Sequence, residues 1–166
     1  MRGARASDGR CPHLLAAITH TDGVVLGQVN VDVKTNEIPM LPTLLDTVEL
    51  TRTIVTADAL HCQRSHAHYL VTRRRAHYLL TVKGNQPALH AQLAALPWTD
   101  VPTGHTAAGK AHGRIEQRTL KVLTVTAGIN FPHAAQALQI TRRSRRPRSK
   151  KWSTETVYAV TDLTAA

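Results

Sequence analysis

The first half of the chain alternates short apolar runs with polar turns. Residues 13–19 and 24–31 are apolar, and the Asp22-Gly23 dipeptide between them predicts a tight β-hairpin. A helix is predicted to follow, because apolar residues then recur at helical spacing on one face. Asn36 is a candidate N-cap for this helix. The pattern thus indicates two strands that pair locally and one amphipathic helix.

Two more strands and two more helices are predicted before residue 100. The apolar run 53–59 predicts a buried strand with Asp58 at its C-terminal end, and residues 76–82 predict another strand. Helices are predicted over residues 63–74 and 87–97. This order of elements is typical of a mixed sheet covered by helices.

The pattern changes after residue 100. Residues 114–125 alternate polar and apolar side chains, as an antiparallel strand with one wet face does. We predict a short helix over Phe131–Leu138 and a final strand over residues 156–160. Between them, residues 142–151 hold seven basic side chains in ten positions. A run of this kind repels itself and is not expected to be rigid without a partner.

Charge separates this chain from an ordinary globular domain. The 166 residues include 21 Lys and Arg but 11 Asp and Glu, for a net charge of +10. No acidic residue occurs in 59–99 or in 117–154. This imbalance indicates nucleic acid as the partner, and a solvated basic surface is the alternative. A low aromatic content of 4% argues against a binding surface built from rows of stacked rings.

Cysteine usage and hydropathy bear on the compartment. Cys11 and Cys62 lie far apart and form no CxxC pair, which suits a reducing compartment. Neither a signal peptide nor an apolar stretch of membrane-spanning length is evident. We therefore expect a cytoplasmic protein that does not contact a membrane.

Asp58 is the residue with the clearest chemical interest. In open α/β sheets, ligands and catalytic groups lie at the C-terminal ends of strands, so a carboxylate there can hold a divalent metal. Asp is equally suited to capping the helix that follows. Local pattern alone leaves both roles open.

Several motifs, taken in order, resemble one family. These are the hairpin and the segments Lys34–Pro39, Ile54–His61, Thr81–Gln86 and His112–Glu116. Together they resemble bacterial insertion-sequence transposases of the DDE class, which have a ribonuclease-H-like core. The resemblance covers essentially the whole chain.

The resemblance implies a catalytic site of two aspartates and a glutamate. In the family these acids hold two Mg²⁺ or Mn²⁺ ions for DNA cleavage and strand transfer. Asp58 matches the second aspartate, whereas the segments that carry the other two acids would fall before Met1 and after Ala166. We therefore expect a polypeptide truncated at both ends, inactive alone, with weak or absent metal binding. Asp8, which precedes a glycine, lacks the preceding apolar strand and is not assigned as a catalytic acid.

The expected fold is α/β: an incomplete ribonuclease-H-like mixed sheet with flanking helices, plus a C-terminal, mainly β insertion. We expect residues 1–99 to form the partial core and 100–166 the insertion, with the basic loop 142–151. Expected partners are the DNA ends of an insertion sequence, and either complementary transposase fragments or further copies of the chain. The alternative function is a non-catalytic, basic nucleic-acid-binding module.

Candidate DNA-contacting residues come from the basic runs and from the turn after residue 82. They are Arg73, Arg74, Arg75, Lys83, Asn85, Arg114, Arg142, Arg143, Arg145, Arg146, Arg148, Lys150 and Lys151. Asn85 is also a candidate N-cap of the helix that follows. A zinc site is a further candidate, from His61, Cys62, His66 and His68. Helical spacing does not bring these four together, so we prefer a role in an amphipathic helix near the DNA-facing surface.

Overall fold

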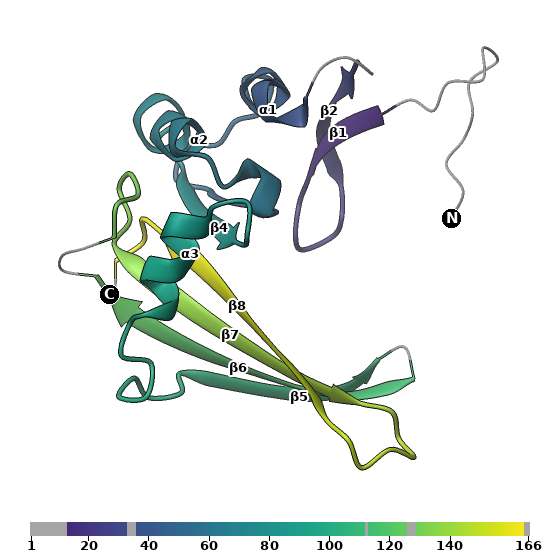
Figure 1. The fold of residues 1–166 in the computed structure, drawn as a ribbon. Helices are drawn as coiled ribbons and strands as arrows, with labels where there is room; N and C mark the ends of the chain where they lie inside the picture. Colours follow the sequence, from purple (N-terminus) through teal and green to yellow (C-terminus); the bar gives the residue numbers. More distant parts are fainter. Residues whose placement is uncertain (1–12, 33–35, 112, 126–128, 165–166) are drawn as a thin grey trace. The chain divides into compact units, whose positions relative to one another are not determined.

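The computed structural model describes residues 13–32, 36–111, 113–125 and 129–164 (Figure 1). The chain divides into two compact units, Met1–Thr53 and Ile54–Ala166. Cys11 and Asp8 lie outside the described residues. Each unit is described by itself below.

The described residues of the first unit form a hairpin and one helix. Strands β1 (His13–Ile18) and β2 (Val25–Val31) pair antiparallel, and helix α1 spans Glu37–Leu45. Gly23 turns the chain with a φ of 69°, a left-handed conformation that glycine adopts without steric cost. The predicted hairpin is therefore confirmed, and so is the Asn36 cap, whose side chain accepts a hydrogen bond from the Ile38 N–H at 3.2 Å.

Helix α1 packs closely on the hairpin at Gly27. A Cβ atom at this position would lie 3.1 Å from Thr47 Oγ1 and 3.3 Å from Leu44 Cδ1, so glycine permits the close approach. Leu41, Leu44 and Leu45 are buried. Along β1, exposed residues alternate with half-buried ones from Leu14 onward, so one face of the strand is open to solvent.

The second unit is built on a six-stranded mixed sheet in the order β3-β4-β8-β7-β6-β5. β3 and β4 are parallel, and all other neighbours are antiparallel. The strands are β3 (Ile54–Ala57), β4 (His77–Val82), β5 (His105–Ala111), β6 (Arg114–Thr124), β7 (Gln136–Arg145) and β8 (Ser153–Thr161). This mixed α/β architecture confirms the expected fold class and is compatible with a ribonuclease-H-like core. The predicted division between residues 99 and 100 stays a prediction.

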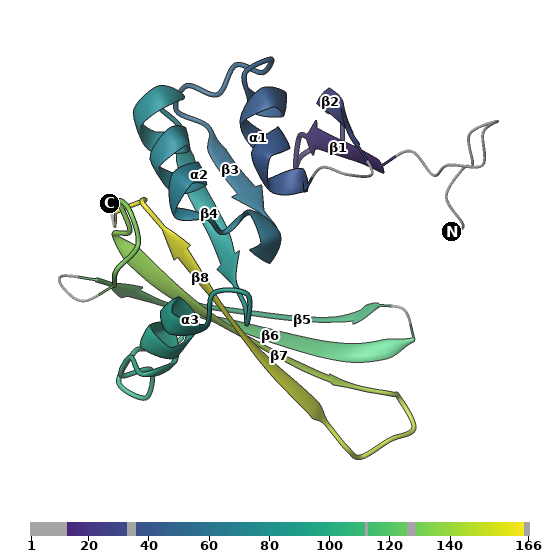
Figure 2. The same ribbon diagram turned by 45° about the horizontal axis from the view of Figure 1, so that its top comes forward.

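Helical segments pack beside β4 and β8 (Figure 2). They are the 3₁₀ turn η1 (Ala59–His61), helix α2 (Arg64–His68), the π-helical turn η2 (Tyr69–Arg73) and helix α3 (Pro87–Ala94). Tyr78, Leu80 and Val82 alternate along β4 and are almost fully buried, as are Leu70 and Leu93 from the helical segments. This apolar core fixes the strand ends from which the candidate sites extend.

Some sequence-based expectations are wrong. Phe131–Leu138 is not a helix, because residues 131–133 form a bend and a turn, residues 134–135 have no regular structure, and Gln136 begins β7. The Tyr78 ring meets Phe131 edge-on, with 6.0 Å between ring centroids, and the Tyr78 hydroxyl donates to the Pro132 carbonyl at 2.6 Å. These contacts hold the segment against the sheet. The prediction of a buried strand over 53–59 is also wrong, since Ile54 is 48% exposed because β3 is the edge strand.

Residues 142–145 also differ from expectation, since they continue β7: all four pair with β6, and residues 142–144 also pair with β8. The first part of the basic run is therefore held in a backbone ladder. Among the described residues, no helix has both the length and the apolar character needed to cross a membrane.

Candidate acidic site and candidate nucleic-acid interface

Asp58 directly follows β3 and has an extended backbone, with φ −71° and ψ 176°. Its Oδ1 atom accepts a hydrogen bond from the Leu60 N–H at 3.0 Å, so the capping role is confirmed. The side chain is exposed. The backbone carbonyl of Asp58 accepts a separate hydrogen bond from the His61 N–H at 3.1 Å. The cap uses one carboxylate oxygen, and the role of Asp58 as a metal ligand remains a prediction.

Two amide side chains hold the turn that follows Asp58. The Asn85 Nδ2 atom donates to the Ala59 carbonyl at 2.6 Å, and the Gln86 Nε2 atom donates to the Cys62 carbonyl at 2.9 Å. Because β3 and β4 are parallel, the turns after both strands meet at one edge of the sheet. Asn85 is not the N-cap of α3: that position is Gln86, which makes no side-chain cap bond. The interpretation of Asn85 as a helix cap is thus wrong, and its predicted contact with DNA is untested.

The four residues considered for zinc do not form one cluster. Cys62 is fully buried, and burial raises the pKa of its thiol to about 11. The His66 Nδ1 atom lies 3.1 Å from the His61 carbonyl oxygen, whereas the His68 Nδ1 atom lies 3.3 Å from His133 Nε2. Within the described ranges, no group of three or more His, Cys, Asp or Glu side chains is placed to hold a metal ion.

The basic residues around β4 are divided between its two ends. Arg73, Arg74 and Arg75 precede the strand, and Lys83 follows it. Six residues of strand span about 20 Å, so the arginine triplet and Lys83 lie at opposite ends of β4, and their predicted contacts with DNA are untested. Arg73, Arg75 and Lys83 are exposed.

The remaining basic candidates gather on a β extension of the second unit. We call the outer halves of β6, β7 and β8, together with loop 146–152, the basic arm; it extends beyond the end of β4 in Figure 1. Its cations are Arg114, Arg118, Arg142, Arg143, Arg145, Arg146, Arg148, Lys150 and Lys151.

On one face of the arm, a carboxylate gathers two arginines. Glu116 on β6 is 8% exposed and accepts hydrogen bonds from Arg142 and from the Arg118 Nη2 atom, the latter at 3.2 Å. Hydrogen bonding to Arg142, supported by the positive charge of both arginines, holds the pKa of Glu116 below its usual value. Arg142 is therefore engaged within the protein.

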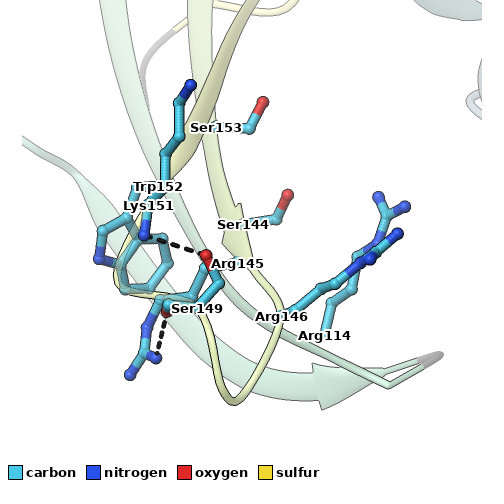
Figure 3. A pocket seen from close by; sticks show the side chains of 8 residues that line it. All are labelled: Arg114, Ser144, Arg145, Arg146, Ser149, Lys151, Trp152 and Ser153. Carbon is cyan, nitrogen blue, oxygen red and sulfur yellow. Dashed lines mark hydrogen bonds between the residues drawn. The ribbon is translucent and has the colours of Figure 1, made fainter.

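On the other face, Trp152 gathers two more arginines. The guanidinium carbons of Arg143 and Arg145 each lie 5.1 Å from the centroid of the Trp152 ring. Arg145 also donates from Nη1 to the Ser149 carbonyl at 3.0 Å (Figure 3). The same nitrogen donates to the Pro147 carbonyl at 3.3 Å. The loop is closed by the Lys151 N–H, which donates to the Ser149 hydroxyl at 3.1 Å.

An open cavity of about 650 Å³ lies at the base of this loop. Arginine, lysine and serine side chains line it beside Trp152, and no carboxylate does (Figure 3). Arg114 and Arg146 also line a neighbouring cavity, which adds Arg148. Cations that are distant in sequence, at 114 and at 145–151, thus share one surface. Sequence reasoning missed Trp152 and Glu116, although an indole directly after a basic run in a chain poor in aromatic residues was an available signal.

The fold and these surfaces define a class: a mixed α/β protein, compatible with a ribonuclease-H-like core, that carries an acid at a strand tip and a basic β-arm. A family model described as "Transposase DDE domain" matches residues 2–159. The chain therefore belongs to the DDE transposase domain family.

Bacterial relatives carry corresponding names. The chain is 44% identical over 78 residues to "Putative transposase YncI" of Escherichia coli K12, which covers 47% of this chain and 31% of the relative. It is 37% identical over 125 residues to "Uncharacterized protein in dhlA 3'region" of Xanthobacter autotrophicus, which covers 73% of this chain and 42% of the relative. The chain thus spans less than half the length of these curated relatives. No solved structure matches it.

Proposed function

We propose that this chain is the DNA-contacting and partly catalytic portion of an insertion-sequence transposase, and that DNA is its partner in the cytoplasm. The observation that carries the proposal is the match to the transposase DDE domain over residues 2–159. The acid at the tip of β3 and the basic arm support it, because DNA cleavage needs metal-binding carboxylates and a cationic surface for the phosphate backbone.

Asp58 is proposed as one ligand of the divalent metal ions. Bound Mg²⁺ or Mn²⁺ would activate the attacking oxygen and stabilise the leaving oxygen in phosphodiester cleavage. The described residues do not fit such a site by themselves, because no group of three metal-binding side chains occurs among them. A single carboxylate holds Mg²⁺ weakly, since this ion requires near-octahedral oxygen ligation.

We therefore propose that the other acids are supplied from beyond the described residues, either by more of the same protein or by a complementary fragment or further copy. The polypeptide of 166 residues is then expected not to cleave DNA alone. A nicking assay on the ends of the element, with Mg²⁺ or Mn²⁺, tests this expectation. Robust cleavage that Asp58→Ala abolishes would show that the chain is active by itself.

A non-catalytic nucleic-acid-binding module is the second candidate. The capping bond from Leu60 to Asp58 favours it, because that bond gives the carboxylate a structural role. Flanking genomic sequence discriminates the two candidates. Adjacent frames that encode the remaining acids, within terminal inverted repeats, support the transposase, whereas a stand-alone gene without them supports the module.

A further inference from the structure

The basic arm concentrates like charges that would otherwise drive the loop open. Residues 142–151 contain seven cations and no acid, and residues 146–152 make no strand ladder. The loop nevertheless folds back on itself through the hydrogen bonds of Arg145 and Ser149. A contact that attracts positive charge would offset the repulsion between neighbouring guanidinium groups.

Trp152 provides that contact. Side chains alternate between the two faces of a strand, so Arg143 and Arg145 project from the same face of β7, whereas Arg142 projects from the other. Both guanidinium groups lie at 5.1 Å from the indole centroid, within the range of a cation–π interaction. The negative face of an aromatic ring attracts cations, so one ring draws two like charges to fixed positions.

We propose that Trp152 is a positioning residue that orders Arg143, Arg145 and the loop cations into a binding surface for the phosphate backbone of duplex DNA. This inference rests on the proposed DNA partner. Nothing in the resemblance or the family match assigns a role to Trp152.

The lining of the cavity supports a phosphate ligand. Arg114, Arg146 and Lys151 surround it without a carboxylate, and serine side chains add neutral donors. Arginine has five N–H donors, and Arg145 uses one nitrogen on the loop carbonyls, so its fork retains donors for a phosphate.

The same geometry favours the backbone over an unstacked base. A ring that stacks on an unpaired base must be free to receive that base. The Trp152 ring already contacts two guanidinium groups, so its role is to hold these cations in place. Strand β6 also brings Arg114 beside the loop cations, which makes the positive surface wider than the loop alone. A broad cationic surface whose indole ring already contacts two guanidinium groups suits a duplex.

The test compares Trp152→Leu with Trp152→Phe in the full chain, by fluorescence anisotropy with a short labelled duplex over a range of salt concentrations. Leucine keeps an apolar side chain but has no π face, whereas phenylalanine retains one. We expect Trp152→Leu to weaken duplex binding about fivefold, and Trp152→Phe to recover most of that loss. The slope of log K against log salt should stay that of the wild type in both variants, because no cation is removed. Arg143→Gln should lower that slope by about 0.9.

Circular dichroism and thermal unfolding of each variant verify that the fold is retained. Binding of Trp152→Leu equal to the wild type would overturn the inference while leaving the proposed DNA partner intact. A loss confined to single-stranded DNA would also overturn it, since the ring would then stack on bases. If the wild type binds no duplex at all, the proposed DNA partner fails together with the inference.

Discussion

The Asp58 turn and the basic arm are both carried by the same six-stranded sheet, yet their charged side chains have different surroundings. In the arm, Glu116 and Trp152 each gather two arginines, so the positive surface is organised by described residues. At the tip of β3, hydrogen bonds from Leu60 and Asn85 fix the turn, but within the described residues Asp58 belongs to no group of three metal-binding side chains. A binding surface can thus be complete where a metal site is not.

The difference follows from what each chemistry requires. Counterion release needs only several cations near a phosphate backbone, and their exact spacing matters little. A divalent metal needs several oxygen ligands at one point, which usually come from separate elements of the fold. We therefore expect the arm to give measurable DNA binding in this chain, and we expect catalysis to depend on further acids.

The largest effect is expected when two charges are removed from the arm, compared with two removed from the arginine triplet before β4. Arg146→Gln with Arg148→Gln should lower the salt slope of duplex binding by about 1.8, which corresponds to about thirtyfold weaker binding at physiological salt. Both side chains are exposed in the loop and line the same cavity. Salt titration of binding to a labelled duplex measures both quantities.

The matched control is Arg73→Gln with Arg75→Gln, which removes the same charge from two exposed residues at the far end of β4. We expect a smaller change in slope, because the control leaves the arm intact. Equal slopes for the two double variants would show that binding follows net charge and that the arm has no special part in it.

The second prediction concerns pH and the Glu116 face of the arm. Folding lowers the pKa of Glu116 from its ordinary value of 4.5, so the folded arm gains stability above that value and loses it as the pH falls through the lowered pKa. Glu116→Gln removes this pH-dependent contribution to the stability of the arm. We expect the thermal midpoint of Glu116→Gln to lie below that of the wild type at neutral pH. The two midpoints should converge well below pH 4.5.

Glu155→Gln is the control for charge alone, because Glu155 is exposed and lies opposite Arg142 on β8. It should shift the midpoint less than Glu116→Gln at neutral pH. A Glu116→Gln variant that stays below the wild type by the same amount down to pH 3 would assign its effect to packing, and the ion pairs would then contribute little.

Local signals predicted the parts of the fold that local chemistry determines. Asp22-Gly23 predicts the hairpin turn, and Asn36 predicts the N-cap of α1; the structure has both. The apolar run before Asp58 forms strand β3, as predicted. Strand β5 gave no such signal, because its small and polar residues carry no period-two pattern and it forms by pairing with β6. The segment 131–138 has a helix-like composition, but Tyr78 holds its start against the sheet and Gln136 enters β7.

The site was predictable to the same extent. Clustered charge indicated the basic surface, and strand position indicated Asp58. The contact of Trp152 with Arg143 and Arg145 depends on how β8 pairs with β7, which composition does not reveal. The bond from Asn85 to Ala59 joins residues 26 apart along the chain, so its role was likewise hidden.

The smallest expected effect tests that bond. Asn85→Ala leaves the buried Ala59 without the side-chain donor to its carbonyl and should lower the free energy of unfolding by about 1 kcal/mol, as measured by urea denaturation. The substitution should also loosen the turn locally, because the same turn carries the capping bond from the Leu60 N–H to Asp58. Amide exchange of Leu60 should accelerate in Asn85→Ala and stay unchanged in Lys83→Ala, which alters an exposed residue of the same turn. Unchanged Leu60 exchange in Asn85→Ala would mean that the strand alone positions Asp58, and the turn after β4 would then have no part in presenting the acid.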